Sequence, residues 1–440
     1  MSRIHRGLTI TVTLPEERLE EAAVLLEQLN QQLKESQSAY REKLETVLFL
    51  SWLVLPVQWY AGNERLPARI LLMTSYVGDR RHHLRELAEY FGDHLKQVFE
   101  MSDEFPKRGK KINMVAFLRR RAVPNTFYSG FKFIDTHEIA QEAHLKEAVF
   151  KHLSQKVLDG ELTDDSPQSI KDQIESYITG HPSYQWVRKG SRGLGWDKFR
   201  MLFPLGIFAL LMGGSLISLV LCFFIDSFLL SLLAWVFPSF VVLMGLLLVL
   251  LRFNELSPHI PGSEASDDRI REIVRRETNP VINEMTVIAP LKKGWIRRVF
   301  LAVSLRLVFL IRYFSYIPTV HTARWLQLDR GRRLVFIATF DNISEAYAHD
   351  FVDSERRTMN MAVIFSHAFG FPATRWLVHK QYNHRSEYMK GVRAHQQITQ
   401  CWYAHNHELS VENLKNNRAF RLGLFRKMKE SEIRNWLLRV

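Results

Sequence analysis

The chain has 440 residues, of which 47% are hydrophobic and 24% are charged, and its formal net charge is +13. This length predicts two or three domains, and a composition of this kind excludes a disordered or fibrous chain. The two cysteines, Cys222 and Cys401, are too few for a disulfide-stabilised secreted fold and suit a reducing cytoplasm.

Residues 1–153 read as one domain with six main elements. Residues 8–14 alternate in polarity, as a half-buried strand does. Pro15-Glu16-Glu17 then favours a helix start, because proline suits the first turn and acids suit the positive end of the helix dipole. The later elements are strands 47–57 and 69–76, helix 82–101, an extra segment 110–121 and a closing strand 125–134. This strand-helix-strand-strand-helix-strand order is that of a ferredoxin-like unit.

Two charge-free runs follow, at residues 201–225 and 227–251, and each is long enough to cross a bilayer core. Arg200 and Arg252 flank the pair, and Asp226 lies between the runs. We therefore predict a transmembrane helical hairpin at residues 201–251. A pair of buried core helices and a re-entrant hairpin are the two alternatives. The polar stretches 154–200 and 252–282 are expected to be linkers, and residues 160–182 look like a loose one.

Positive residues gather on the outer flank of each run. They are Arg188, Lys189, Arg192, Lys198 and Arg200 before the first run, and Arg252, Arg269, Arg271, Arg275 and Arg276 after the second. Positive residues near span ends favour the cytoplasmic side. We therefore expect both soluble domains on the cytoplasmic side of a membrane, the bacterial inner membrane if the chain is bacterial. The first seven residues lack the apolar core of a signal peptide.

Residues 283–440 repeat the order of the first domain. The predicted elements are strand 284–291, helix 295–314, strands 319–328 and 333–340, helix 344–365, an extra segment 374–392 and strand 397–405. Residues 322–328 match 49–55, residues 333–340 match 69–76, and His407-Glu408-Leu409 matches His137-Glu138-Ile139. The offset is far longer than a solenoid repeat, which indicates a domain duplication. The predicted fold class is α+β, with two fused ferredoxin-like domains and an inserted transmembrane hairpin.

The predicted helix 295–314 differs from its acidic counterpart in the first domain. It is strongly apolar, but arginines such as Arg298, Arg306 and Arg312 interrupt it too often for a third span. This pattern is typical of a helix at the level of the lipid headgroups, with apolar residues in the bilayer and guanidinium groups on phosphates. The alternative is an unusually apolar core helix. Membrane lipids explain the net positive charge without a nucleic-acid partner.

Two ferredoxin-like units in one chain resemble the dimeric α+β barrel superfamily, whose tandem build the dye-decolourising haem peroxidases share. The second domain also resembles a group of uncharacterised bacterial proteins through residues 317–325, Phe340-Asp341-Asn342 and residues 366–372 with Thr374-Arg375-Trp376. The likeness to the peroxidases is architectural, because their GxxDG haem-site signature is absent from both domains. Such a likeness implies a fold and does not by itself carry an activity.

The second domain carries ionisable residues at positions where the first domain has small or apolar ones. His321, Arg324 and Asp341 correspond to Leu48, Ser51 and Val77. The candidate catalytic residues are His321, Arg324, Asp341 and His367, and the candidate cofactor-binding residues are His405, Arg375 and Trp402. Such a set could hold a haem through a histidine, with an arginine and an acid beside it, but it matches no standard zinc pattern.

Each candidate also has a structural interpretation. A strand histidine commonly satisfies a hydrogen bond, Asp341-Asn342 is a natural turn and helix-capping pair, and Arg375-Trp376 suits cation–π stacking. The first domain lacks the counterparts of His321 and Asp341, so we expect their replacement by alanine to leave folding nearly intact.

Two functions therefore remain open. One is a non-catalytic membrane module that binds lipid or docks a soluble redox partner at the bilayer surface. The other is a haem- or metal-dependent peroxidase-like oxidoreductase that acts on an apolar, membrane-derived substrate. The first is favoured, because the sequence holds no complete catalytic motif, P-loop or nucleophile elbow. The sequence leaves the cofactor and the formation of a homo-oligomer open.

Overall fold

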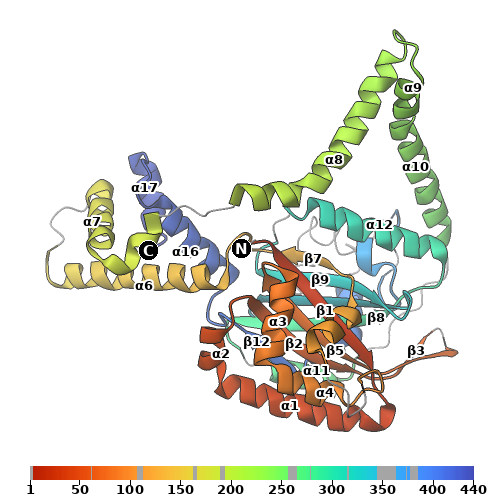
Figure 1. Ribbon diagram of the computed structural model, residues 1–440, viewed down its shortest axis with the longest axis horizontal. Helices are drawn as coiled ribbons and strands as arrows, with labels where there is room; N and C mark the ends of the chain where they lie inside the picture. The colour runs from red at the N-terminus through yellow and green to blue at the C-terminus, as the bar shows by residue number, and fades with distance from the viewer. Residues whose placement is uncertain are drawn as a thin grey trace.

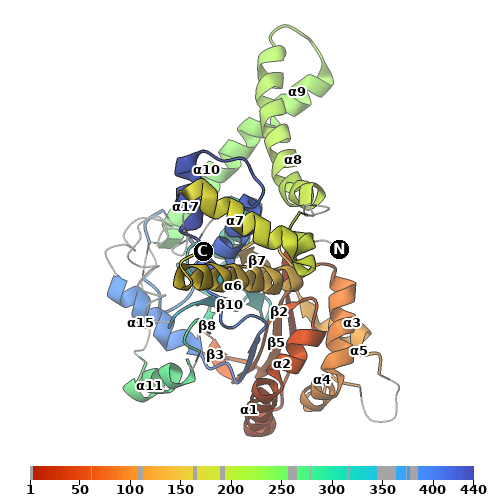
Figure 2. The same cartoon turned by 90° about the vertical axis from the view of Figure 1, so that its left-hand side faces the viewer.

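The computed structural model describes residues 3–60, 62–106, 112–161, 166–188, 194–255, 265–277, 279–314, 317–343, 363–372, 374–376 and 385–440. The chain is a mixed α/β protein with two five-stranded antiparallel sheets. The sheets form the body of the molecule, and an apolar helical hairpin projects from it (Figures 1 and 2).

The first sheet has the strand order β12-β2-β5-β1-β6. Its strands are β1 (His5–Thr13), β2 (Val47–Leu55), β5 (Arg69–Val77), β6 (Ala122–Val123) and β12 (Cys401–Ala404). Its outer face packs on α1 (Leu19–Glu35), α3 (Arg80–Tyr90), α4 (Gly92–Phe99) and α5 (Met114–Arg121). The short elements η1 (Glu16–Arg18), α2 (Gln37–Lys43), β3 (Gln58–Tyr60) and β4 (Glu64–Leu66) complete this region.

The second sheet has the strand order β11-β8-β10-β9-β7. Its strands are β7 (Thr126–Ser129), β8 (Ile282–Pro290), β9 (Val320–Leu328), β10 (Arg333–Asp341) and β11 (Gln396–Gln397). The helices α12 (Trp295–Ile311) and α15 (Arg385–His395) pack on its outer face. In Figure 2, α3 and α15 lie on opposite sides of the two sheets.

The predicted closing strands 125–134 and 397–405 pair with the sheet of the other half through residues 126–129 and 401–404, which corrects the expectation that each completes its own domain. Thr126 pairs with Trp325 on β9, although the preceding residues 122–123 pair with β1. Cys401 likewise pairs with Trp52 on β2, although residues 396–397 pair with β8. Pro124 separates the first pair of segments, because it has no N–H to continue the ladder. Backbone hydrogen bonds therefore join the two halves of the chain in both directions.

The facing sides of the sheets form a core of their own. At one end it is apolar, because side chains from five strands pack together there; they include Leu53, Leu71, Met73, Ile288, Leu326 and Ile337. The remaining part holds polar residues such as Ser75, Thr322 and Arg324. The pattern follows from the two-residue period of a strand, which directs alternate side chains to one face.

A helical lobe replaces the loose linker expected at residues 160–182. It consists of α6 (Thr136–Leu158), α7 (Pro167–Gly180), η2 (Pro182–Arg188), α16 (Val411–Gly423) and α17 (Glu430–Leu437) (Figure 1). Ser166 caps α7 by accepting from the Ser169 N–H, and Pro167 occupies its first turn. Ile174 and Ile178 then bury one side of the helix. Sequence reasoning missed this helix because the segment is mostly polar, although Ile174 and Ile178 have the four-residue spacing of one helix face.

One other predicted linker contains a helix, and one predicted helix is two helices. The expected linker 252–282 contains α11 (Asp267–Arg276). The single helix predicted at residues 82–101 is two helices, α3 and α4, which meet at Phe91 and Gly92. The helix predicted at residues 344–365 lies mostly outside the described residues. The predicted central strands agree with the structure to within a few residues.

The hairpin consists of α8 (Leu194–Leu221), α9 (Phe228–Ala234) and α10 (Val236–Glu255). The segments Gly195–Leu221 and Phe228–Phe253 are long and apolar enough to cross a membrane, and only 11% of the most apolar window of each is buried. Such exposure argues against core helices. Ser215 fastens α8 to the returning chain, because its hydroxyl donates to the Ala234 carbonyl at 3.0 Å and accepts from the Phe237 N–H at 2.8 Å.

Candidate functional site

His321 and Asp341 lie together at one end of the second sheet. His321 Nε2 is 2.7 Å from Asp341 Oδ1, and the imidazole, 1% exposed, contacts the rings of Phe49 and Phe131 edge-on. Both carboxylate oxygens of Asp341 also accept the Val411 N–H, at 3.1 Å. The pair therefore ties β10 to the first turn of α16. This arrangement gives both residues structural contacts.

Arg324 lies on β9, the strand that holds His321, but its side chain extends to the first sheet. Its guanidinium donates to the Leu8 carbonyl at 2.8 Å and to Ser75 Oγ at 2.6 Å. Glu284 on β8 lies in the same region, where its carboxylate accepts from Thr399 Oγ1 at 3.2 Å. Sequence reasoning did not single out Glu284, which is an ordinary strand position by pattern.

Burial governs the charges of this inter-sheet cluster. It lowers the pKa of Arg324 to about 10, and the nearby Glu284 carboxylate opposes that change. Burial also raises the pKa of Glu284 to about 7, although a hydrogen bond from Ser51 and the charge of Arg324 act in the opposite direction. A carboxyl with such a pKa could exchange a proton near neutral pH. Neither Glu284 nor Arg324 lines the cavity described below.

His367 lies at the far end of the second sheet, against α12. Phe369 and Ala368 pair with the end of β8, whereas Asp341 pairs with its first residue, Ile282. The nine-residue strand places these ends roughly 25–30 Å apart. His367 is 1% exposed, and burial, with the charges of Arg297 and Lys292, lowers its pKa to about 3. The imidazole is therefore neutral at physiological pH.

The three candidate cofactor-binding residues are dispersed. His405 and Trp402 belong to the β12 region at the edge of the first sheet, where His405 donates its backbone N–H to the Leu48 carbonyl at 2.9 Å. Burial lowers the pKa of His405 to about 4. Arg375 is exposed beside Trp376, whose backbone N–H donates to Glu255 at the end of α10. Of the seven candidates, the structure brings only His321 and Asp341 into direct contact.

No group of three or more metal-ligating side chains occurs within the part of the chain that the structure describes. The seven candidates thus form neither a described metal cluster nor a single cavity wall. The residues that do meet around a cavity are basic, and they come from both halves of the chain and from the hairpin.

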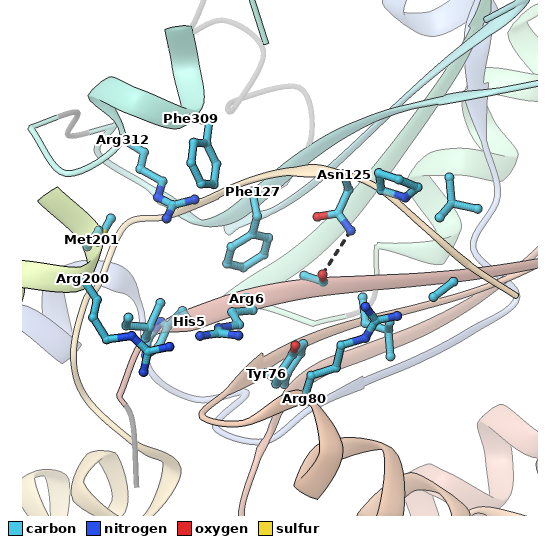
Figure 3. Close-up of a pocket in the computed structure, with 16 residues that line it drawn as sticks. His5, Arg6, Tyr76, Arg80, Asn125, Phe127, Arg200, Met201, Phe309 and Arg312 are labelled. Carbon is cyan, nitrogen blue, oxygen red and sulfur yellow. Dashed lines mark hydrogen bonds between the residues drawn. The ribbon is translucent and has the colours of Figure 1, made fainter. Parts of the chain in front are cut away.

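This basic pocket, of about 520 Å³, lies where α8 leaves the body (Figure 3). Its walls come from β1, the start of α3, the crossing segment between β6 and β7, the foot of α8 and the end of α12. The charged lining residues are four arginines, Arg6, Arg80, Arg200 and Arg312, and His5 also lines the pocket but is neutral, because burial lowers its pKa to about 4. Within the described part of the chain, no carboxylate lines the pocket. Asn125 fixes the crossing segment, because its side chain donates to the Gly7 carbonyl at 3.0 Å (Figure 3).

The arginines differ in how they are held. Arg6 lies opposite Tyr76 in the register of β1 and β5. Burial raises the pKa of Tyr76, and the charges of Arg6 and Arg80 oppose that change. Arg312 lies over the Phe309 ring at 3.7 Å. Burial lowers the pKa of Arg312 to about 10, and repulsion from Arg6 adds to this effect.

Sequence reasoning noted Arg200 and Arg312 only as charges near the bilayer, and it missed Arg6 and Arg80. Arg6 stands in a strand and Arg80 begins a helix, so neither position shows a local signal. Only the fold places these four side chains around one space. Comparisons with protein-family models, curated proteins and solved structures find no match for this chain.

Proposed function

We propose that this chain is a membrane-anchored, tandem ferredoxin-like module that rests on the bilayer through α12 and binds lipid there. The hairpin supplies the anchor, and the soluble body lies on the cytoplasmic side. Docking of a soluble redox partner on the same body is compatible with this role. The function is one of binding, because the candidate catalytic residues do not share one site. His321 and Asp341 lie at one end of the second sheet, His367 lies at the other end, and Arg324 points to the first sheet.

Strand order supports the tandem part of the proposal. In the first sheet β6-β1-β5-β2 follow one another, and in the second β11-β8-β10-β9 do. Numbered within each half, both orders read four, one, three, two, which is the order of a ferredoxin-like unit. Each sheet then gains a fifth strand from the other half, β12 on β2 and β7 on β9. A duplicated unit that exchanges its closing strands accounts for this arrangement.

The exposed side of α12 carries the proposal of a bilayer contact. Apolar side chains follow one another at four-residue intervals along it: Trp295, Val299, Val303, Leu307 and Ile311, which are 60, 36, 37, 54 and 38% exposed. Residues at this spacing neighbour one another on a helix surface. We call this row the α12 stripe.

The opposite side of α12 is occupied by the protein. Leu301 and Leu305 pack into the second sheet, while Phe300 packs against Leu247 and Leu251 of α10. Figure 1 shows α12 between the lower ends of α8 and α10, across the base of the hairpin. A bilayer that contains the hairpin would therefore contact the α12 stripe. Without a bilayer the stripe would be an apolar surface exposed to water, and such surfaces mark interaction sites.

Site-directed spin labelling tests the bilayer contact in the full chain. A label at Leu307→Cys, in a Cys222→Ser background, should be relaxed more by lipid-soluble oxygen than by a water-soluble nickel chelate in vesicles. Cys401 is fully buried and need not be replaced. A label at Val24→Cys, an exposed apolar residue of α1, is the matched control and should show the reverse preference. Equal behaviour of the two labels would contradict the proposal.

A peroxidase-like oxidoreductase is the second candidate, and His367 is the observation that favours it. Neither ring nitrogen of this buried imidazole has a hydrogen-bond partner within the described residues, and its low pKa keeps it neutral. A neutral, unpaired imidazole is suited to ligate a haem iron or another metal. A Soret band in the purified chain that disappears in His367→Ala would support this function, whereas a colourless, metal-free protein would remove it.

A further inference from the structure

The basic pocket has more positive charge than the protein itself neutralises. None of the four arginines makes an ion pair with a carboxylate of the described residues. Asp79, next to Arg80, is already engaged, because it caps α3 by accepting from the Arg81 and His82 N–H groups at 2.8 and 3.2 Å. Arg6 also lowers the pKa of Asp79, as a smaller influence than those two bonds.

Two of these arginines repel each other at half-buried positions, because the charge of Arg6 adds to the burial that lowers the pKa of Arg312. Arg312 packs against the Phe309 ring and, with a pKa of about 10, still carries its charge at neutral pH. A desolvated cation without a counter-ion costs free energy, and an anion in the pocket would remove that cost for both groups. Figure 3 shows Arg6, Arg200 and Arg312 around the same open space.

The side chains present favour a phosphate over a simple carboxylate. Several guanidinium groups around one cavity can each donate in a fork to the oxygens of a tetrahedral anion. Apolar lining residues such as Phe309, Met201 and Val123 provide a second, non-polar wall. The ligand that fits both parts is an amphiphile with a phosphate at one end.

The position of the pocket identifies where this amphiphile comes from. Arg200 and Met201 stand where the first charge-free run begins, and Phe309 and Arg312 end the helix that carries the α12 stripe. The pocket therefore opens at the level where a bilayer around the hairpin would have its headgroups. We infer that this pocket binds the phosphate of an anionic membrane phospholipid, with Arg6, Arg80, Arg200 and Arg312 as its ligands.

This inference rests on the proposed function and narrows it to one lipid class and one site. The crossing segment with Pro124 and Asn125 forms one wall of the pocket. The pocket therefore depends on the passage of the chain from the first sheet to the second at this point. Because residues of α8, α12 and β1 all line this pocket, the bound lipid would hold the hairpin, the second half and the first half together.

Native mass spectrometry of the full chain in a neutral detergent provides the test. Dioleoyl phosphatidylglycerol should be retained about tenfold more tightly than dioleoyl phosphatidylcholine, a difference of about 1.4 kcal/mol, because the choline ammonium of the second lipid would lie among the arginines and be repelled by them. The variant Arg6→Gln/Arg312→Gln should lose this preference. The variant Arg298→Gln/Arg306→Gln, which removes the same charge from α12 outside the pocket, should keep it.

Further arms separate the alternatives. Arg200→Gln, at an exposed position on α8, should weaken the preference without loss of thermal stability, so a folding defect in the double variant leaves the inference testable. Competition by glycerol phosphate or inorganic phosphate at the concentrations at which the lipid binds would overturn the assignment to a lipid. An undiminished preference in both pocket variants would overturn the site.

The spin label at Leu307 distinguishes failure of this inference from failure of the proposed function. If the label lies in lipid while the pocket variants still retain phosphatidylglycerol, the body rests on the bilayer but the pocket is not the lipid site. If the label lies in water in the unmodified chain, the bilayer contact itself is wrong.

Discussion

Asp341 Oδ1 lies 2.7 Å from His321 Nε2, so the carboxylate at the end of β10 fixes an imidazole on the neighbouring strand β9. The same carboxylate accepts the Val411 N–H at the start of α16. Sequence comparison of the two halves singled out this pair as chemistry that the fold does not need. The structure gives it a mechanical task, because it connects the second sheet to the helical lobe.

Asp341→Ala should lower the free energy of unfolding by about 1–3 kcal/mol, since it leaves a buried imidazole nitrogen and a helix N–H without their acceptor. Denaturant unfolding of the detergent-purified chain measures this. Asp268→Ala removes an exposed carboxylate that pairs with Arg271 on α11, and it should change stability by less than about 0.5 kcal/mol. Equal effects of the two changes would contradict a structural role for Asp341.

Glu284→Gln should alter how stability depends on pH. In the folded chain the pKa of Glu284 is raised from 4.5 to about 7, so the folded state holds this proton more tightly than the unfolded state does. Stability from this group is therefore greatest below pH 4.5 and is lost as pH rises towards 7. At pH 8 the Gln variant should be the more stable protein, because it removes a carboxylate whose ionised form burial disfavours. We expect a gain in the free energy of unfolding of about 2 kcal/mol, which is less than the full pKa change implies because Glu284 is only partly shielded from solvent.

The comparison across pH isolates this carboxyl from others that titrate in the same range. Unfolding of both proteins at pH 5 and pH 8 gives the difference directly, and it should be smaller at pH 5. A constant difference at the two values would mean that Glu284 is ionised throughout, in a stable pair with Arg324.

Glu255→Ala should release the segment around Arg375 from the hairpin. Glu255, at the end of α10, accepts from Thr374 Oγ1 at 2.8 Å and from the Trp376 N–H at 2.9 Å. Loss of two such bonds, at about 0.5–1.5 kcal/mol each, should raise tryptic cleavage after the exposed Arg375 roughly tenfold through local opening. Peptide mapping by mass spectrometry follows the cleavage.

Glu272→Ala is the matched control, because this exposed glutamate of α11 pairs with Arg269 at the surface. Its cleavage rate at Arg375 should equal that of the unmodified chain. An unchanged rate in Glu255→Ala would show that other contacts hold the segment in place.

Reporter fusions at Met1 and Val440 should lie on the same side of the membrane, and that side should be the cytoplasm. The hairpin contains two segments able to cross, so an even number of crossings separates the ends. The strand exchange adds a second reason, since β7 and β12 can pair with the opposite halves only in one compartment. Opposite reporter signals at the two fusions would exclude a spanning hairpin in this fold.

The amino-acid sequence by itself determined the elements whose cause is local. Alternating polarity placed the central strands, and the uncharged runs around Asp226 placed the hairpin. The apolar and basic pattern of residues 295–314 indicated α12 and its exposed side. Each of these signals depends on neighbours within one or two helical turns, so no knowledge of distant residues was needed.

Tertiary structure decided everything that depends on partners far apart in the chain. Residues 126–129 are an acceptable edge strand for either sheet, and only the crossing at Pro124 assigns them to β9. The same holds for the pocket, because nothing near Arg6 in the sequence indicates that Arg312 will lie beside it. The pairing of strands and the meeting of distant side chains depend on the free energy of the whole packed chain. A local sequence pattern cannot predict them, because it contains only the contributions of neighbouring residues.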